Sequence, residues 1–314
     1  MSQYNLSDVD ISPEKSERYE AISITLVTLK RKINAFYELT RPWNWLRMQV
    51  PMAICGAILF ANGFPNLNII LICFIAGASL SAGGYAINDY FDRSIDIINA
   101  PNRPIPSNRI APLEALFLAI FLSGVGITIS LSLSWINVII AAATATYGFI
   151  YAIFLKRFGN LLDTVSFAFF MGFPVLYGAF ATSTNKMSLV LAFAVAMYIG
   201  GAHIIGTIKD LEGDRKNSCR TVAVVFGSKK AAKIAAGLTT ISLILFWIFA
   251  TYLSRNFPSF LGLGIISAFV LISLLRLIHN QSKQKAKEIL SLQKTFLFAI
   301  LIVFTLVKLF SSLS

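Results

Sequence analysis

The chain has 314 residues, of which 56% are apolar or aromatic and 13% are charged, whereas soluble domains carry about 25% charged residues. So few charges cannot coat a water-exposed surface, and these figures also exclude a disordered chain, a collagen and a disulfide scaffold. In a soluble protein, the formal net charge of +12 would suggest nucleic acid as a partner.

The N-terminal segment, residues 1–35, is mostly polar and contains no uninterrupted apolar run of the kind that marks a cleaved signal peptide. Residues 36–314 are expected to form one membrane domain. In it, apolar runs of about 20 residues, the length that crosses a bilayer, alternate with short polar joints. The runs cover residues 43–62, 67–88, 112–132, 135–155, 160–182, 187–208, 231–253, 258–278 and 293–313. Their length and hydropathy predict an all-α polytopic membrane protein with nine transmembrane helices.

The basic residues are distributed unevenly between the two sides of this topology. Most of the 27 Lys and Arg residues lie in the N-terminal segment and in the joints after the second, fourth, sixth and eighth runs. By the positive-inside rule, the N-terminus and these joints are cytoplasmic. We therefore expect a multi-pass integral protein of the cell membrane, in contact with the lipid bilayer. The topology explains the positive charge, so no nucleic acid partner is expected.

Acidic residues are scarce, and two groups of them stand at the expected cytoplasmic ends of the second and sixth spans. Steps of three and four residues place the members of each group on one helix face. Like charges stacked in this way repel, so stability does not explain them, and acids at a membrane boundary are usually functional. The first group is Asp89, Asp92 and Asp96, preceded by Asn88, and the second contains Asp210, Glu212 and Asp214.

The composition of these groups favours a magnesium–diphosphate site. Carboxylates without neighbouring His or Cys suit a hard divalent cation, and Mg²⁺ commonly combines one or two carboxylates with substrate phosphates. The same joints carry cations that could bind a diphosphate. They include Arg93, Arg103, Lys156, Arg157 and Lys209. The alternative interpretation is a solvated charged loop that only marks the topology.

Two further polar residues lie near these groups. Asp163, close to the start of the fifth run, is interpreted as a polar cavity residue. His203 precedes Asp210 by seven residues and shares its helix face, and we interpret it as structural or cavity-lining rather than as a base. The three cysteines and two histidines have no spacing typical of a metal site or a disulfide framework.

These patterns resemble the UbiA superfamily of intramembrane prenyltransferases. The resemblance rests on N-D-x-x-D-x-x-x-D from Asn88 to Asp96, on D-x-x-x-D at Asp210 and Asp214, on Arg41-Pro42, and on Tyr151 with Lys156-Arg157. It implies nine helices around a central cavity and a Mg²⁺-dependent transfer of a polyprenyl group, geranylgeranyl in our interpretation, from its diphosphate to a membrane-associated acceptor. The implied metal-binding and catalytic residues are Asp89, Asp92, Asp96, Asp210 and Asp214, with Lys156 as a further catalytic residue. The implied substrate-binding residues are Asn88, Arg41, Arg93, Arg103, Arg157, Tyr151, Asn160 and Lys209.

The acceptor is indicated by a second resemblance. Residues 95–107 and the segment from Glu212 to Gly227 are similar to the branch that holds archaeal digeranylgeranylglyceryl phosphate synthases and chlorophyll synthases, in which the position of Asn108 is often glycine. We favour geranylgeranylglyceryl phosphate, in archaeal ether-lipid synthesis, as the acceptor. An aromatic quinone precursor and a tetrapyrrole, chlorophyllide, stay open as alternatives. A cation-coupled transporter is more remote, since its acids should lie near mid-bilayer in broken helices.

Overall fold

The computed structural model describes residues 13–155, 160–216, 219–253 and 257–313, and within these ranges it contains helices and no strands. The helices are α1 (Pro13–Thr40), α2 (Pro42–Arg47), α3 (Gln49–Phe60), α4 (Leu67–Asn99), α5 (Pro112–Ser130), α6 (Trp135–Ile150), the π-helical turn η2 (Tyr151–Leu155), α8 (Asn160–Phe170), α9 (Phe173–Phe180), α10 (Met187–Lys209), α11 (Leu211–Lys216), α12 (Val222–Phe226), α13 (Ser228–Leu253), α14 (Phe257–His279) and α15 (Lys283–Leu313). The expected all-α fold is confirmed.

Eight helical stretches in the described residues are long and apolar enough to cross a membrane. They correspond to the second to ninth expected spans. The first expected span, residues 43–62, is divided between α2 and α3 at Met48. Pro51 explains the division, because a proline ring clashes with the carbonyl four residues earlier and has no N–H to donate. In the fifth span, α8 ends at Phe170, four residues before Pro174, for the same reason.

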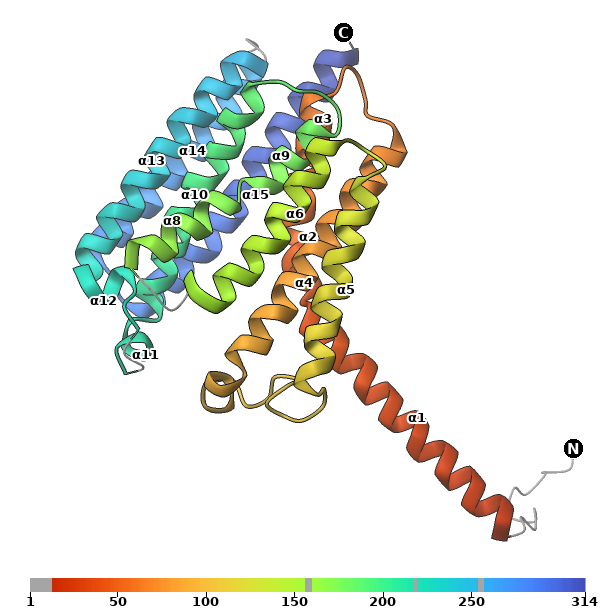
Figure 1. Cartoon of the computed structure of the whole chain (residues 1–314). Helices are drawn as coiled ribbons and strands as arrows, with labels where there is room; N and C mark the ends of the chain where they lie inside the picture. Colours follow the sequence, from red (N-terminus) through yellow and green to blue (C-terminus); the bar gives the residue numbers. More distant parts are fainter. Residues whose placement is uncertain (1–12, 156–159, 217–218, 254–256, 314) are drawn as a thin grey trace, which may run out of the picture.

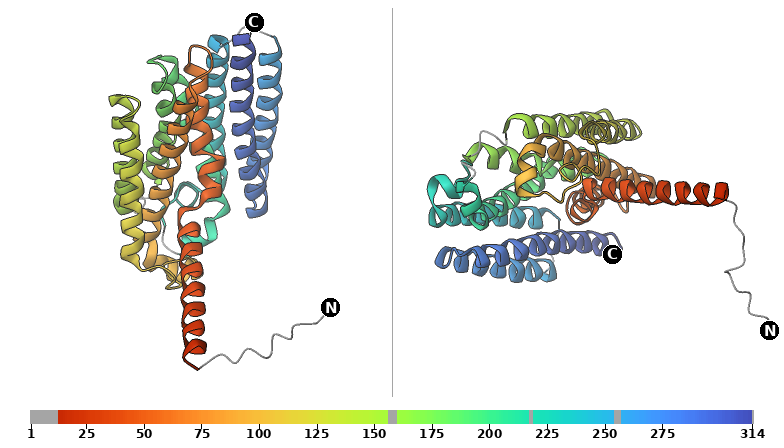
Figure 2. Two further views of the ribbon diagram at one scale, coloured as in Figure 1. Left: turned by 90° about the vertical axis from the view of Figure 1, so that its right-hand side faces the viewer. Right: turned by 90° about the horizontal axis from the view of Figure 1, so that it is seen from below.

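The membrane helices run roughly side by side in one bundle (Figures 1 and 2). One end of the bundle contains the joint of residues 100–111, α11, α12 and the C-terminal end of α1 (Figure 1). The C-terminal end of α15 lies at the opposite end (Figure 1). We name the first of these the polar end. The joints after the second and sixth spans thus share one end, as the distribution of basic residues predicts.

Helix α1 runs without a break through residue 35, where the expected boundary of the N-terminal segment lies. Its last turns pack on the bundle through buried Ala35 and Leu39, and the Lys32 ammonium lies 2.5 Å from a Glu114 carboxylate oxygen on α5. The N-terminal part of α1 projects away from the bundle (Figures 1 and 2). From Pro13 onward, the polar N-terminal segment is therefore one extended helix.

Close helix contacts through glycine hold α3 against α9. A Cβ atom at Gly178 would lie 1.7 Å from the Ala53 carbonyl oxygen, and one at Gly56 would lie 2.3 Å from the Val175 carbonyl oxygen. The atoms that an added methyl group would meet belong to the backbone of the facing helix, so the two helices would have to move apart. Membrane helices that approach this closely depend on small residues at the contact. This packing fixes the wall of the bundle that faces α4.

We expect Gly178→Ala to lower the thermal unfolding midpoint of the detergent-solubilised protein markedly, because overpacking costs about 1–3 kcal/mol or more. Gly124→Ala on α5 is the matched control, since a methyl group there meets no described atom within 4 Å. Equal midpoints for the two variants would contradict the packing described for α3 and α9.

Candidate functional site

Two carboxylates of the first acidic group are buried at the polar end of α4. Asp89 and Asp96 are 3% and 5% exposed. The Arg103 Nη1 atom lies 2.5 Å from Asp96 Oδ2 and 3.5 Å from Asp89 Oδ1, and Arg41 donates a further hydrogen bond to Asp89. One guanidinium thus bridges two carboxylates seven residues apart, which confirms that these two acids share a helix face. Buried carboxylates are tolerated because cations neutralise them.

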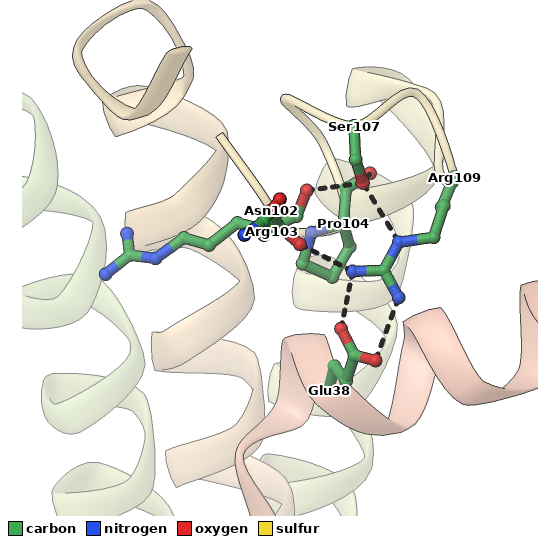
Figure 3. Close-up of polar contacts among 6 residues, drawn as sticks. All are labelled: Glu38, Asn102, Arg103, Pro104, Ser107 and Arg109. Carbon is green, nitrogen blue, oxygen red and sulfur yellow. Dashed lines mark hydrogen bonds and ion pairs between the residues drawn. The ribbon is translucent and has the colours of Figure 1, made fainter. Parts of the chain in front are cut away.

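Arg103 is presented by the joint of residues 100–111, which a second arginine fastens to α1. The Arg109 guanidinium donates to both Glu38 carboxylate oxygens, at 2.8 and 2.6 Å, and to the Asn102 carbonyl oxygen at 2.7 Å. Figure 3 shows Arg109 reaching Glu38 while Arg103 extends in the opposite direction.

Asn108, in the same joint, has a φ of 54°. This is a left-handed conformation that asparagine and glycine adopt readily, so asparagine can replace a glycine at this turn.

The Glu38–Arg109 contact also affects ionisation. The hydrogen bond from Arg109 lowers the pKa of the Glu38 carboxyl below its ordinary value. Since the folded-state pKa is lowered, the contact stabilises the fold fully above the ordinary pKa of glutamate. The stabilisation is lost as the pH falls through the lowered value.

Arg41 is held in position by an unusual backbone conformation. With φ 48° and ψ 57°, it lies in the left-handed region between α1 and α2, a conformation that is uncommon outside glycine and often marks functional sites. Its guanidinium also lies 5.2 Å from the centre of the Tyr85 ring. Arg41 was predicted to bind substrate, and the structure places it at the acidic group.

The second acidic group lies where α10 meets α11. Asp210 caps α10, and the Asp214 N–H donates to the Asp210 carbonyl oxygen at 2.9 Å, so the expected spacing of one helical turn is kept. The Lys209 ammonium lies 3.1 Å from Asp210 Oδ2, and the Thr221 hydroxyl donates to Asp214 Oδ2 at 3.0 Å. Partial burial raises the pKa of Asp214, against the lowering effect of the Thr221 hydrogen bond.

Two cavities border consecutive residues of α4, Asn88 and Asp89. An outer cavity of about 420 Å³ is lined by Asp89 and by residues of the neighbouring joint, and an inner, mostly apolar cavity of about 210 Å³ is lined by Asn88. Consecutive residues of α4 therefore face different spaces. The inner cavity is lined by Gln49, Ala53, Gly77, Leu80, Ser81, Gly84, Tyr85, Asn88, Thr144, Tyr147, Gly148, Tyr151, Phe167, Phe170, Met171, Phe173, Pro174 and Tyr177.

Asn88 is the polar residue best placed for a ligand in the inner cavity. Its Oδ1 atom is buried and has no hydrogen-bond partner among the described residues. Buried polar atoms in this state are rare, because an unsatisfied acceptor costs about 1–3 kcal/mol. An outer cavity lined by charged side chains beside an inner cavity that is mostly apolar suits a molecule with a charged head and a hydrocarbon tail.

The remaining predicted residues are distributed as follows. Tyr151 lines the inner cavity, while Arg93 turns toward its own helix, donating to the Tyr90 carbonyl oxygen at 2.7 Å. Asp92 is partly buried on α4. The predicted Lys156 and Arg157, and the side chain of Asn160, lie outside the described residues. Across the described ranges, no group of three or more Asp, Glu, His or Cys residues is arranged to hold a metal ion by itself.

Several site residues were not predicted from the sequence. Gln49 and Tyr85 line the inner cavity, and Glu38 secures the joint that carries Arg103. Tyr85 precedes Asn88 by three residues, so helical periodicity places both on one face. Gln49 is a polar residue within the first apolar run. The spacing of Tyr85 and Asn88 and the polar character of Gln49 could have identified the residues that line the inner cavity. The contact between Glu38 and Arg109 could not be predicted in this way, because it forms only in the folded chain.

A comparison with known families decides the assignment of the chain. The model of the UbiA prenyltransferase family matches residues 50–306. The chain belongs to the UbiA prenyltransferase family. The match includes both acidic groups and the helices that line the inner cavity, and it identifies the protein as a prenyltransferase enzyme of the membrane.

Curated relatives and solved structures agree with this assignment. The chain is 29% identical to a digeranylgeranylglyceryl phosphate synthase of Thermococcus kodakarensis over 88% of the chain and 99% of the relative. It is 33% identical to one of Korarchaeum cryptofilum over 85% of the chain and 94% of the relative. A solved structure of a digeranylgeranylglyceryl phosphate synthase superposes with a TM-score of 0.77 at 24% identity, covering 88% of this chain and 99% of the other.

A UbiA homologue of Archaeoglobus fulgidus, bound to GPP and Mg²⁺, superposes with a TM-score of 0.64 at 18% identity, over 85% of this chain and 99% of that one. These likenesses show that the chain has the fold of UbiA proteins.

We expect Glu38→Gln to loosen the joint of residues 100–111 without unfolding the bundle, because it removes the charge from an exposed ion pair. The measurement is the rate of trypsin cleavage after Arg109 in detergent at pH 8, which should rise several-fold. Glu288→Gln, which breaks an exposed pair with Lys285, is the control. A Glu38→Gln rate equal to that of the wild type would contradict the anchoring role.

Proposed function

We propose that the protein transfers a geranylgeranyl group from its diphosphate to geranylgeranylglyceryl phosphate, a lipid acceptor. The observation that carries this proposal is the position of two consecutive residues of α4. Asp89 borders an outer cavity that Arg41 and Arg103 also line, and Asn88 borders a mostly apolar inner cavity. A prenyl diphosphate has the same division into charged head and hydrocarbon tail. The likeness to digeranylgeranylglyceryl phosphate synthases over most of the chain supports the choice of acceptor.

Mg²⁺ fits the residues at this site. The guanidinium of Arg103 already lies between Asp89 and Asp96, so these carboxylates can share one cation, and Asn88 offers an oxygen without a partner. Diphosphate oxygens would complete the coordination, as Mg²⁺ commonly requires. The proposed ligands are Asp89, Asp92, Asp96, Asp210 and Asp214. When bound, Mg²⁺ would neutralise charge on the departing diphosphate. The Archaeoglobus fulgidus homologue of the same fold is bound to GPP and Mg²⁺.

The cations around the acidic groups have a matching role. Arg41 and Arg103 are held against the carboxylates at the mouth of the outer cavity, where their guanidinium groups can donate to diphosphate oxygens. Fixed donors at this position stabilise the charge that develops on the leaving group. We assign the same task to Lys156, Arg157 and Lys209, and propose that Arg93, Tyr151 and Asn160 complete the substrate site.

The inner cavity is proposed to bind the start of the prenyl chain. Its aromatic lining includes Tyr147 stacked on Phe170 at 3.5 Å between ring centres, and Phe173 packs against Phe170 at 4.5 Å. An apolar, water-poor lining protects a reactive allylic carbon from water until the acceptor arrives. We propose that the polar end faces the cytoplasm of the cell, because the basic joints gather there.

Purified protein should release diphosphate from geranylgeranyl diphosphate only when Mg²⁺ is present. We expect Asp92→Asn and Asp214→Asn each to reduce this release by roughly 100-fold or more, because each removes a metal ligand. Glu288→Gln, an exposed residue of the same end, should behave as the wild type. Full activity in either aspartate variant would exclude the proposed metal site.

The acceptor is tested by a competition panel of geranylgeranylglyceryl phosphate, 4-hydroxybenzoate and chlorophyllide, with transfer products identified by mass spectrometry. We expect product with the lipid phosphate. Turnover with only the aromatic or the tetrapyrrole acceptor would replace the lipid assignment by one of those two alternatives, while leaving the prenyltransferase assignment in place.

A further inference from the structure

A buried histidine–carboxylate pair lies next to the inner cavity. His203 on α10 places its Nε2 atom 3.2 Å from Asp163 Oδ2 on α8. Asp163 is 8% exposed. The two helices approach closely at Gly200, where an added Cβ would lie 3.0 Å from the Ala168 side chain. The contact is therefore fixed by packing and is not a chance encounter of two flexible side chains.

The pair determines which nitrogen of His203 carries the lone pair. Against an ionised Asp163, the Nε2 atom of a neutral imidazole ring must be the donor, because a carboxylate only accepts hydrogen bonds. In that tautomer the lone pair is on Nδ1. A histidine oriented in this way by a carboxylate is suited to accept a proton.

The position of His203 relates it to both parts of the site. Its ring stacks on Phe167 at 4.7 Å between ring centres, and Phe167 lines the inner cavity. On its other side, His203 lies within electrostatic range of Asp214. The His203 side chain is 23% exposed. His203 thus stands between the cavity and the second acidic group.

A purely structural role does not account for these features. A contact kept only for stability would not leave the buried Asp163 Oδ1 atom without a hydrogen-bond partner among the described residues. Tyr151, which lines the inner cavity, also interacts electrostatically with the Asp163 carboxyl group. The chain has two histidines, and the other, His279, is exposed at the end of α14. From the sequence alone we interpreted His203 as structural or cavity-lining, and its contact with Asp163 changes that interpretation.

We propose that His203 accepts the proton that the acceptor loses during prenyl transfer, and that Asp163 is its positioning residue. The inference rests on the proposed function. The bond between the prenyl C1 atom and the diphosphate oxygen breaks, and its electron pair leaves with the diphosphate. An acceptor oxygen forms the new bond to C1, and its proton moves to His203 Nδ1. Asp163 stabilises the resulting imidazolium, which returns the proton to water at the polar end.

The test separates departure of the diphosphate from capture by the acceptor. Full-length protein with Mg²⁺, labelled geranylgeranyl diphosphate and geranylgeranylglyceryl phosphate is assayed for released diphosphate, ether product and geranylgeraniol. In His203→Gln, ether formation should fall by roughly 100-fold, a common contribution of a general base, and the proportion of geranylgeraniol should rise. Asp163→Asn should shift the products in the same direction, and His279→Gln should match the wild type.

A second variant tests the chemistry independently of packing. In His203→Ala, added imidazole should restore ether formation in proportion to its concentration. Ether formation within about threefold of the wild type in His203→Gln, or a loss that imidazole does not restore in His203→Ala, would overturn the assignment. If the wild type releases no diphosphate or forms no ether, the proposed function itself fails, which is a distinct result.

Discussion

A carboxylate buried at the end of a membrane helix must be neutralised, and the polar end of this bundle is organised around that requirement. Asp89 and Asp96 are almost inaccessible on α4, and removing a cation from a buried pair is far more costly than losing a surface ion pair. Arg41 and Arg103 supply the charge from different parts of the chain. Arg41 is positioned by its own left-handed backbone conformation between α1 and α2. Arg103 is positioned by the joint of residues 100–111, which the contact between Arg109 and Glu38 fastens to α1.

In the proposed function, the same arrangement prepares the site for an anionic ligand. Carboxylates and guanidinium groups that neutralise one another can exchange partners when a metal ion and a diphosphate arrive, since each then finds an opposite charge. The site therefore requires no large uncompensated charge before the ligand binds. Because Asn88 and Asp89 face the inner and outer cavities respectively, the exchange would take place where a charged head and an apolar tail separate.

Much of this could be predicted from the sequence because it is local. Apolar run lengths predicted the membrane helices, and steps of three and four residues placed Asp89, Asp92 and Asp96 on one helix face. The division of the first span at Met48 was also predictable, since Pro51 stands four residues after Arg47. The contacts of Glu38 with Arg109, and of Asp163 with His203, join residues 71 and 40 positions apart. No periodicity links them, and only the packing of α1 against the joint and of α8 against α10 brings them together.

In the proposed function, both acidic groups act on one magnesium–diphosphate complex. The most direct test of this shared role is the affinity for a non-hydrolysable geranylgeranyl thiodiphosphate, measured by calorimetry with and without Mg²⁺ in the wild type and in the variants Asp96→Asn and Asp210→Asn. The account predicts that tight binding requires Mg²⁺ and is lost in each variant. Binding that ignores Mg²⁺, or that survives the loss of either acid, would contradict it.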